Sequence, residues 1–154
     1  MLSIFKSLLD SLTQTAEESP QERTHALQLA TAVLLVEVMR ADPAVEPRER
    51  KAVVGALQAR FSLPDDELRQ LVELAEQTAV GASDFFQFTS RINDSFAHPQ
   101  KIQMIEEMWQ IAFADTRLDA HENHLISKIA ALLHVTHGEY IGAKMRAKER
   151  ARLA

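Results

Sequence analysis

Apolar residues recur along the chain at helical spacing, and short polar stretches that resemble helix starts separate them. Positions i, i+3, i+4 and i+7 share one face of an α-helix, so this pattern predicts amphipathic helices. No segment alternates apolar and polar residues as a half-buried strand would. We therefore expect an all-α protein of about seven to eight helices, at residues 2–16, 20–41, 47–61, 65–79, 84–96, 99–114, 120–133 and 137–151.

Capping signals mark the starts of several of these helices. A side-chain acceptor followed three residues later by Glu can satisfy the free N–H groups at a helix N-terminus. Four places show this arrangement, namely Ser19 with Glu22, Glu46 with Glu49, Asp119 with Glu122, and Thr136 with Glu139.

The segments 20–41 and 99–114 are the most continuously apolar, so we expect them to lie at the centre of the fold. Glu37 falls inside the first of them. A buried carboxylate without a partner is costly, so we expect Glu37 to pair with an Arg or Lys or to emerge at a seam.

An acidic pattern occurs twice. Ala41-Asp42 precedes Glu49, and Ala114-Asp115 precedes Glu122 with the same spacing, 73 positions further along. Each copy follows one apolar helical segment and precedes another. The chain therefore reads as a duplicated helix-turn-helix whose copies pack together about a pseudo-two-fold axis.

The repeat extends beyond the acids, with one shift in register. Phe61-Ser62-Leu63 aligns with Leu133-His134-Val135 at an offset of 72, so one residue is inserted or deleted within residues 47–61 or their counterpart.

Composition narrows the class of protein. A chain of 154 residues suits one domain, and four Gly and five Pro leave little turn chemistry for a sheet. The absence of Cys excludes thiolate metal sites and fits a reducing compartment, so we expect a cytoplasmic protein. A net charge of −5 argues against nucleic acid as a partner, and no apolar run approaches the roughly 20 residues of a membrane span.

Residues 1–18 form a separate unit in this interpretation. Leu2, Phe5, Leu8, Leu9 and Leu12 share one stripe, which predicts an N-terminal amphipathic helix that either packs on the duplicated domain of residues 19–154 or faces another molecule. Peripheral contact with a membrane stays open, although Lys6 is the one basic residue in its first ten positions.

The repeated acids have two interpretations. Glu46, Glu49, Asp119 and Glu122 are placed to cap helices, which the helix dipole favours. Alternatively, each Asp approaches the Glu seven residues later and the pseudo-two-fold brings both pairs together. Such a set of oxygen ligands would select Ca²⁺ or Mg²⁺, and an inward His121 or His124 would favour Mn²⁺ or Zn²⁺.

With this doubled acidic pattern, the sequence resembles the TerB-like domain of the tellurite-resistance TerB proteins. The resemblance covers approximately residues 25–148 and rests on the doubled Ala-Asp…Glu pattern between apolar helices. It implies an internally duplicated helical bundle, with metal ligands at Asp42, Glu49, Asp115 and Glu122. Both copies depart from the family's usual Ala-Asp-Gly, having Pro43 and Thr116 where Gly is expected. Pro43 cannot adopt a positive φ, so we expect the acidic corner of Asp42 and Glu49 to fit the family's site less well than the acidic corner of Asp115 and Glu122.

No catalytic motif stands out. His121 and His124 are three positions apart, whereas the zinc-protease motif needs four, and no glycine-rich phosphate loop is present. We therefore expect a non-enzymatic module that binds a divalent cation such as Ca²⁺, Mg²⁺ or Mn²⁺ and contacts another protein, in stress or tellurite-related physiology by the resemblance alone. The alternative is a metal-free scaffold whose acids only cap helices, and a metal-dependent hydrolase ranks third.

Overall fold

The computed structural model describes residues 19–41, 47–82, 84–114 and 120–153, and the side chains of residues 120–122, 152 and 153 are not described. These residues form seven helices and no strand, as the periodicity predicts. The predicted helix 2–16 lies outside them. The helices are α2 (Pro20–Arg40), α3 (Pro47–Phe61), α4 (Asp65–Gly81), α5 (Phe86–Ser95), α6 (His98–Ala112), α7 (Ala120–Leu132) and α8 (His137–Leu153).

Two of the predicted caps are confirmed. The Ser19 hydroxyl accepts a hydrogen bond from the Glu22 N–H at 3.1 Å, and Pro20 occupies the first position of α2. At the start of α8, the Thr136 N–H donates to Glu139 Oε1 at 2.8 Å, and the Glu139 N–H donates to the Thr136 hydroxyl at 3.2 Å. The other two predicted caps involve residues outside the described ranges.

Several helix boundaries differ from the predicted ones by one or two residues, among them the start of α5. The Asp84 carboxylate accepts a hydrogen bond from the Phe86 N–H at 3.0 Å, which closes a local turn before the helix. Helix α5 begins at Phe86, with Phe85 as its N-cap, and not at residue 84.

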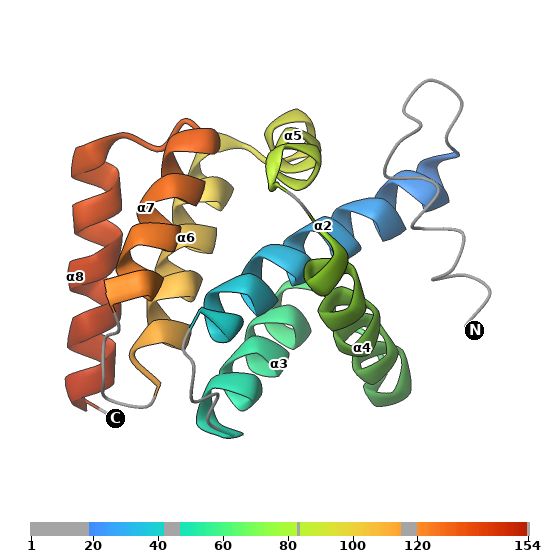
Figure 1. Cartoon of the computed structure of the whole chain (residues 1–154), viewed down its shortest axis with the longest axis horizontal. Helices are drawn as coiled ribbons and strands as arrows, with labels where there is room; N and C mark the ends of the chain where they lie inside the picture. The colour runs from blue at the N-terminus through green and yellow to red at the C-terminus, as the bar shows by residue number, and fades with distance from the viewer. Residues whose placement is uncertain (1–18, 42–46, 83, 115–119, 154) are drawn as a thin grey trace.

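The core forms around α2 and α6, as predicted. Helix α2 crosses the middle of the molecule in Figure 1 and contacts α3, α4, α5, α6 and α7. Within these two helices, the apolar residues Leu27 and Ile102 are only partly buried. Full burial of one large apolar side chain contributes about 1.5–3 kcal/mol relative to exposure. The largest side chains that are fully buried are Trp109, Phe88, Leu29, Leu34, Leu35, Met39, Leu57, Leu71, Ile92, Met104 and Ile105.

The helix pairing repeats within the fold. The two most extensive pairings join α2 to α4 and α6 to α8, so the first and third helices pack together in each of the triplets α2–α3–α4 and α6–α7–α8. Helix α5 lies between the triplets and packs on α2 and α7 (Figure 1). The arrangement is that of a duplicated unit with one connecting helix.

Candidate functional site

Glu49 is the predicted metal ligand whose side chain the structure describes. It lies in the first turn of α3, and none of its surface is exposed. The helix N-terminus favours a negative charge at this position. Burial also lowers the effective dielectric, which strengthens the attraction of a carboxylate for a nearby cation.

The other three predicted ligands are not placed. Asp42 and Asp115 lie outside the described residues, and Glu122 belongs to α7 but its side chain is not described. Within the described part of the chain, no three side chains of His, Asp or Glu are grouped so that they could hold a metal ion. The convergence of the four carboxylates therefore stays a prediction.

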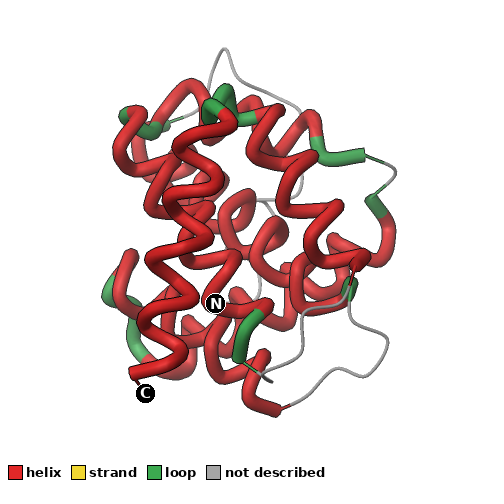
Figure 2. The backbone as a smooth tube through the Cα atoms, turned by 90° about the vertical axis from the view of Figure 1, so that its left-hand side faces the viewer, coloured by secondary structure: helices red, strands yellow, loops and turns green. Residues whose placement is uncertain are grey.

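The helix ends that flank the two acidic corners lie on the same side of the molecule. The C-terminal end of α2 and the start of α3 flank residues 42–46, and the end of α6 and the start of α7 flank residues 115–119. All four ends lie in the lower half of the view in Figure 1, and Figure 2 shows the same bundle of helices turned about the vertical axis. A site shared between the two corners requires such an arrangement.

The first turns of α7 contain the two predicted nitrogen ligands, His121 and His124. The side chain of His124 is exposed, so it does not turn toward the interior, and that of His121 is not described. Next to His124, Asn123 accepts a hydrogen bond at Oδ1 from the Tyr140 hydroxyl at 3.1 Å. Burial raises the pKa of Tyr140, which keeps that hydroxyl protonated as the donor.

An aromatic cluster lies at the end of α6, the helix that precedes the second acidic corner in the sequence. Trp109, in the last turn of α6, stacks on Phe113, the residue that follows this helix, with ring centroids 5.6 Å apart. The ring centroid of Tyr140 lies 5.5 Å from that of the indole. The Lys144 ammonium lies 4.9 Å from the Trp109 ring centroid, a cation–π distance. Trp109 is fully buried, and its indole N–H has no hydrogen-bond partner among the described residues.

Two adjacent carboxylates on α6 tie this helix to opposite neighbours. Glu106 pairs with Arg146 and, at 3.3 Å, with Arg150, both on α8. Glu107 pairs with Arg60 on α3, and each of these two side chains is only about one-tenth exposed. Burial raises the pKa of Glu107, although the Arg60 guanidinium opposes the shift. Sequence reasoning missed both pairs, because no local pattern relates residues about 40 positions apart.

Glu37 behaves as predicted. Its carboxylate accepts a hydrogen bond from Arg40 Nη1 at 2.7 Å, and its side chain is 16% exposed. Burial raises the pKa of Glu37, and the Arg40 charge lowers it in part.

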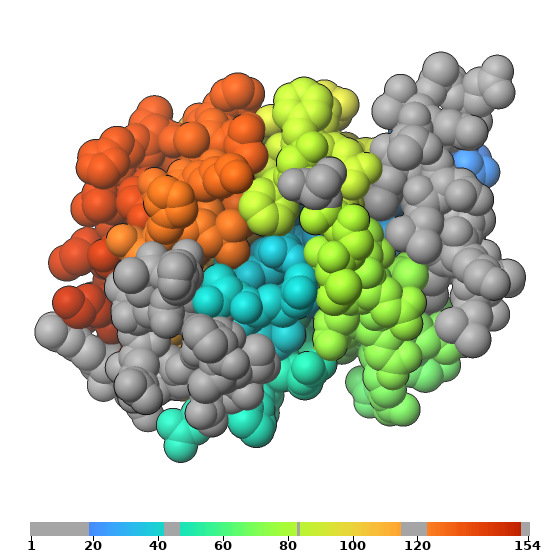
Figure 3. All heavy atoms as spheres, in the orientation of Figure 1, coloured from blue at the N-terminus to red at the C-terminus, as the bar shows by residue number. Residues whose placement is uncertain are grey.

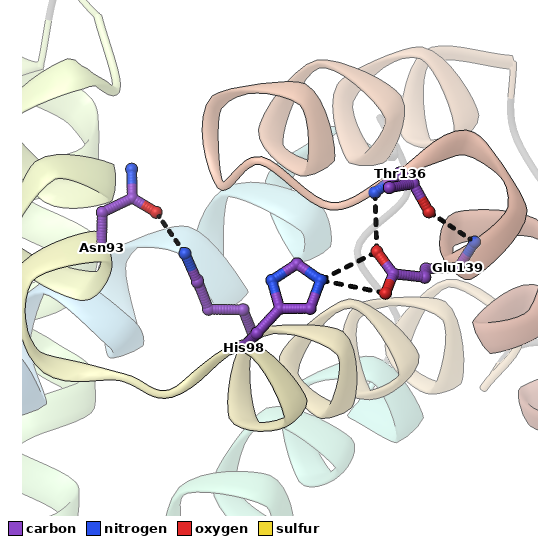
Figure 4. Close-up of polar contacts among 5 residues, drawn as sticks. Asn93, His98, Thr136 and Glu139 are labelled. Carbon is purple, nitrogen blue, oxygen red and sulfur yellow. Dashed lines mark hydrogen bonds and ion pairs between the residues drawn. The ribbon is translucent and has the colours of Figure 1, made fainter.

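Two separate sets of polar contacts join the N-terminal part of α6 to neighbouring helices. His98 Nε2 lies 2.9 Å from both carboxylate oxygens of Glu139 (Figure 4). Asn93 Oδ1, which is labelled in the same view, accepts a hydrogen bond from Lys101 on α6 at 3.0 Å. The Asn93 amide in turn donates to the Leu132 carbonyl at the end of α7 at 3.0 Å. These contacts join α6 to α8 and to α5, and α5 to the end of α7.

No helix in the described ranges is both long enough and apolar enough to cross a membrane. None of the clusters above combines a nucleophile, a base that would activate it and a third group that would orient the base.

Comparison with protein families adds to this geometry. Residues 28–145 match the family model described as tellurite resistance protein TerB, which spans most of the chain. No curated protein and no solved structure matches. With its duplicated helical triplets and its doubled acidic pattern, the chain belongs to the TerB family.

Proposed function

We propose that this TerB family protein is a non-enzymatic module that binds a divalent cation at its two acidic corners and acts by contacting another protein. The corners pair Asp42 with Glu49 and Asp115 with Glu122. The observation that supports the proposal is the fully buried carboxylate of Glu49, in the turn of α3 that follows the first corner.

The chemistry of the ligand atoms determines which cation the proposed site would bind. Carboxylate oxygens suit hard cations, so Ca²⁺ or Mg²⁺ is favoured and Mn²⁺ comes next. Two carboxylates ~5 Å apart repel by about 3 kcal/mol at an effective dielectric of ~20, and a bound cation would reverse that repulsion. Zn²⁺ would need a nitrogen ligand such as His121 or His124, and the side chain of His124 is exposed.

Metal titration of the full chain tests the proposal. Ca²⁺, Mg²⁺ and Mn²⁺ are added in turn to the wild type, to Glu49→Gln and to Asp115→Asn with Glu122→Gln, and binding is followed by calorimetry and thermal melting. These substitutions remove charge and keep shape. At 100 times the dissociation constant, a cation that binds only the folded state adds about 2.7 kcal/mol of stability.

Binding heat and a raised melting temperature are expected for the wild type and not for either variant. Asp66→Asn with Glu67→Gln is the matched control, because it removes the same charge from the first turn of α4 and should leave binding intact. If none of the three ions gives heat or a melting shift, the metal-free scaffold, in which the acids only cap helices, replaces the proposal.

The physiological part of the proposal rests on the family description, which names tellurite resistance. A strain that lacks the protein would then be more sensitive to tellurite. Expression of the wild type would restore growth, and the Asp115→Asn, Glu122→Gln variant would not. Equal growth of the two complemented strains would show that tellurite resistance does not depend on the acidic corners.

A further inference from the structure

Sulfur occurs in this protein only as methionine. The chain has five Met and no Cys, so an oxidant that reaches the protein finds no thiol to react with first. The thioether of methionine is then the group that is most readily oxidised, and its product is the sulfoxide. The location of each methionine therefore determines how an oxidant changes the protein.

The methionines in the described part of the chain differ sharply in exposure. Met39, near the end of α2, is 1% exposed, and Met104 and Met108 on α6 are fully buried. Met145, in the middle of α8, is 55% exposed. A peroxide in water therefore reaches the Met145 sulfur directly, whereas the other three thioethers become accessible only when the core opens. Met1 lies outside the described residues.

Core packing does not account for a methionine at position 145. Ile141, one turn earlier on α8, is 39% exposed, and the next turn on the same face carries Lys148 and Glu149, which are both exposed. Helix α8 forms the left-hand end of the molecule in Figures 1 and 3. A large apolar side chain gains little hydrophobic stabilisation when more than half of it stays in water.

The surroundings of Met145 tolerate the oxidised side chain. A sulfoxide is polar, and its oxygen accepts hydrogen bonds from water or from the Lys148 ammonium, because residues three positions apart are neighbours on a helix surface. Glu149, four positions on, offers acceptors and no donor. A polar group at an exposed position needs no new partner inside the protein, so oxidation here leaves the core intact.

We propose that Met145 is a site of reversible sulfoxidation, at which peroxides modify the folded protein and change the outer face of α8 from apolar to polar. The oxidised and reduced proteins then share one fold and differ on one surface. The reaction does not involve the acidic corners, so it is independent of cation binding.

The oxidation step balances with hydrogen peroxide as the oxidant. A lone pair of the Met145 sulfur attacks one peroxide oxygen and the O–O bond breaks. A proton transfer then lets the second oxygen leave as water. The sulfur gives up two electrons and the peroxide takes them. A thiol-dependent methionine sulfoxide reductase supplies two electrons for the return step, in which the added oxygen leaves as water.

Peroxide treatment of the metal-free full chain, followed by digestion and mass spectrometry, tests this proposal. The peptide with Met145 should gain one oxygen atom at least roughly tenfold faster than the peptides with Met39, Met104 and Met108, because the core must open before they react. In urea, all of these peptides should react at similar rates. A smaller advantage in the folded chain, or a rate at Met145 roughly tenfold below its own rate in urea, overturns the proposal.

Two variants assign the change in surface polarity to this side chain. The treated wild type should elute earlier from a hydrophobic interaction column and keep its melting temperature within roughly 2 °C, as is usual for a change at an exposed position. Met145→Leu, which keeps the apolar side chain and lacks the sulfur, should shift less in elution. Met104→Leu is the matched control and should shift as the wild type does. Equal shifts for Met145→Leu and the wild type overturn the proposal.

Reversal is tested on the oxidised, folded chain. A mixture of reductases that act on the two sulfoxide epimers, with a dithiol as electron donor, should remove the added oxygen from Met145. A short methionine sulfoxide peptide is the positive control. Oxygen that stays on Met145 while the peptide is repaired overturns the reversibility. Glu49→Gln should be oxidised and repaired as the wild type is, which separates this result from the cation test.

Discussion

Ser62 and His134 adopt the same left-handed backbone conformation at the ends of α3 and α7, with φ of 52° and 63°. They are the two non-glycine residues with positive φ in the described part of the chain. The Ser62 N–H donates to the Gln58 carbonyl at 2.9 Å, and the Val135 N–H donates to the Ala130 carbonyl at 3.0 Å. Each turn thus satisfies carbonyls that the end of the helix would otherwise leave free.

Glycine at either position should stabilise the protein. A left-handed conformation costs an L-residue roughly 1–2 kcal/mol, and glycine avoids this cost but loses more entropy on folding. We expect Ser62→Gly and His134→Gly each to add about 1 kcal/mol, which raises the melting temperature by roughly 2–4 °C. Ser62→Ala keeps the strain and should show no gain. A lower melting temperature for both glycine variants would contradict the assignment of strain.

Removal of the Arg60 charge should be strongly destabilising. Arg60→Gln leaves the buried Glu107 carboxylate without its counter-charge, and the loss of one member of a buried pair costs about 3–5 kcal/mol. Urea unfolding at neutral pH measures the loss. Glu76→Gln, which breaks the more exposed pair with Arg50, should cost about 1 kcal/mol or less. Similar losses for the two variants would show that the Arg60–Glu107 pair contributes no more than a surface pair.

Glu139 should make stability depend on pH in the acid range. Hydrogen bonds from the Thr136 backbone, His98 and the Thr136 hydroxyl hold the pKa of Glu139 below its ordinary value of 4.5. Its contribution is therefore fully present above pH 4.5 and is lost as the pH falls through the lower folded-state value. Denaturant unfolding of wild type and Glu139→Gln should show a difference that shrinks below pH 4.5.

The wild type must be compared with Glu139→Gln because other carboxyl groups change the stability in the opposite direction as the pH falls. Burial raises the pKa of Glu37 and of Glu107, so their protonation favours the folded state as the pH falls. Subtraction of the Glu139→Gln curve from the wild-type curve isolates Glu139. A difference that stays constant across the acid range would contradict its role.

Asn93 should hold three helices together. Its amide donates to the Leu132 carbonyl and its oxygen accepts from Lys101, so Asn93→Ala leaves both partners short of a hydrogen bond. A loss of about 1–3 kcal/mol is expected. Hydrogen exchange should accelerate at the end of α7 and in α5 first. Gln87→Ala on the exposed side of α5 serves as the reference, and equal exchange in the two variants would argue against the link.

The sequence predicts the helices and the repeat because both are local properties. Apolar periodicity places α2 and α6 at the core, and Ser19 and Thr136 mark two helix starts that the hydrogen bonds confirm. The offset of 72 between Ser62 and His134 aligns two turns that prove to share one unusual conformation. This turn could be recognised from the sequence because both copies of the repeat need the same backbone conformation at this position.

Contacts between distant segments could not be predicted in the same way. Nothing in the spacing of Glu106 and Glu107 shows that one faces α8 and the other α3, because that depends on how three helices pack. The distance between the two acidic corners could not be predicted either, because it depends on how the two halves of the internal repeat pack against each other. The matching acids predict a metal site, but the packing of the two halves of the repeat determines whether the predicted ligands meet.

Trp109 is the single tryptophan of the chain, and it stacks on Phe113 in the last part of the helix that leads to the second corner. The Lys144 charge lies over its ring, so the indole experiences a strong and oriented electric field. A movement of this helix end by a bound ligand would change that field and shift the emission spectrum. The protein thus contains its own unlabelled optical reporter, at one position and without background from a second indole.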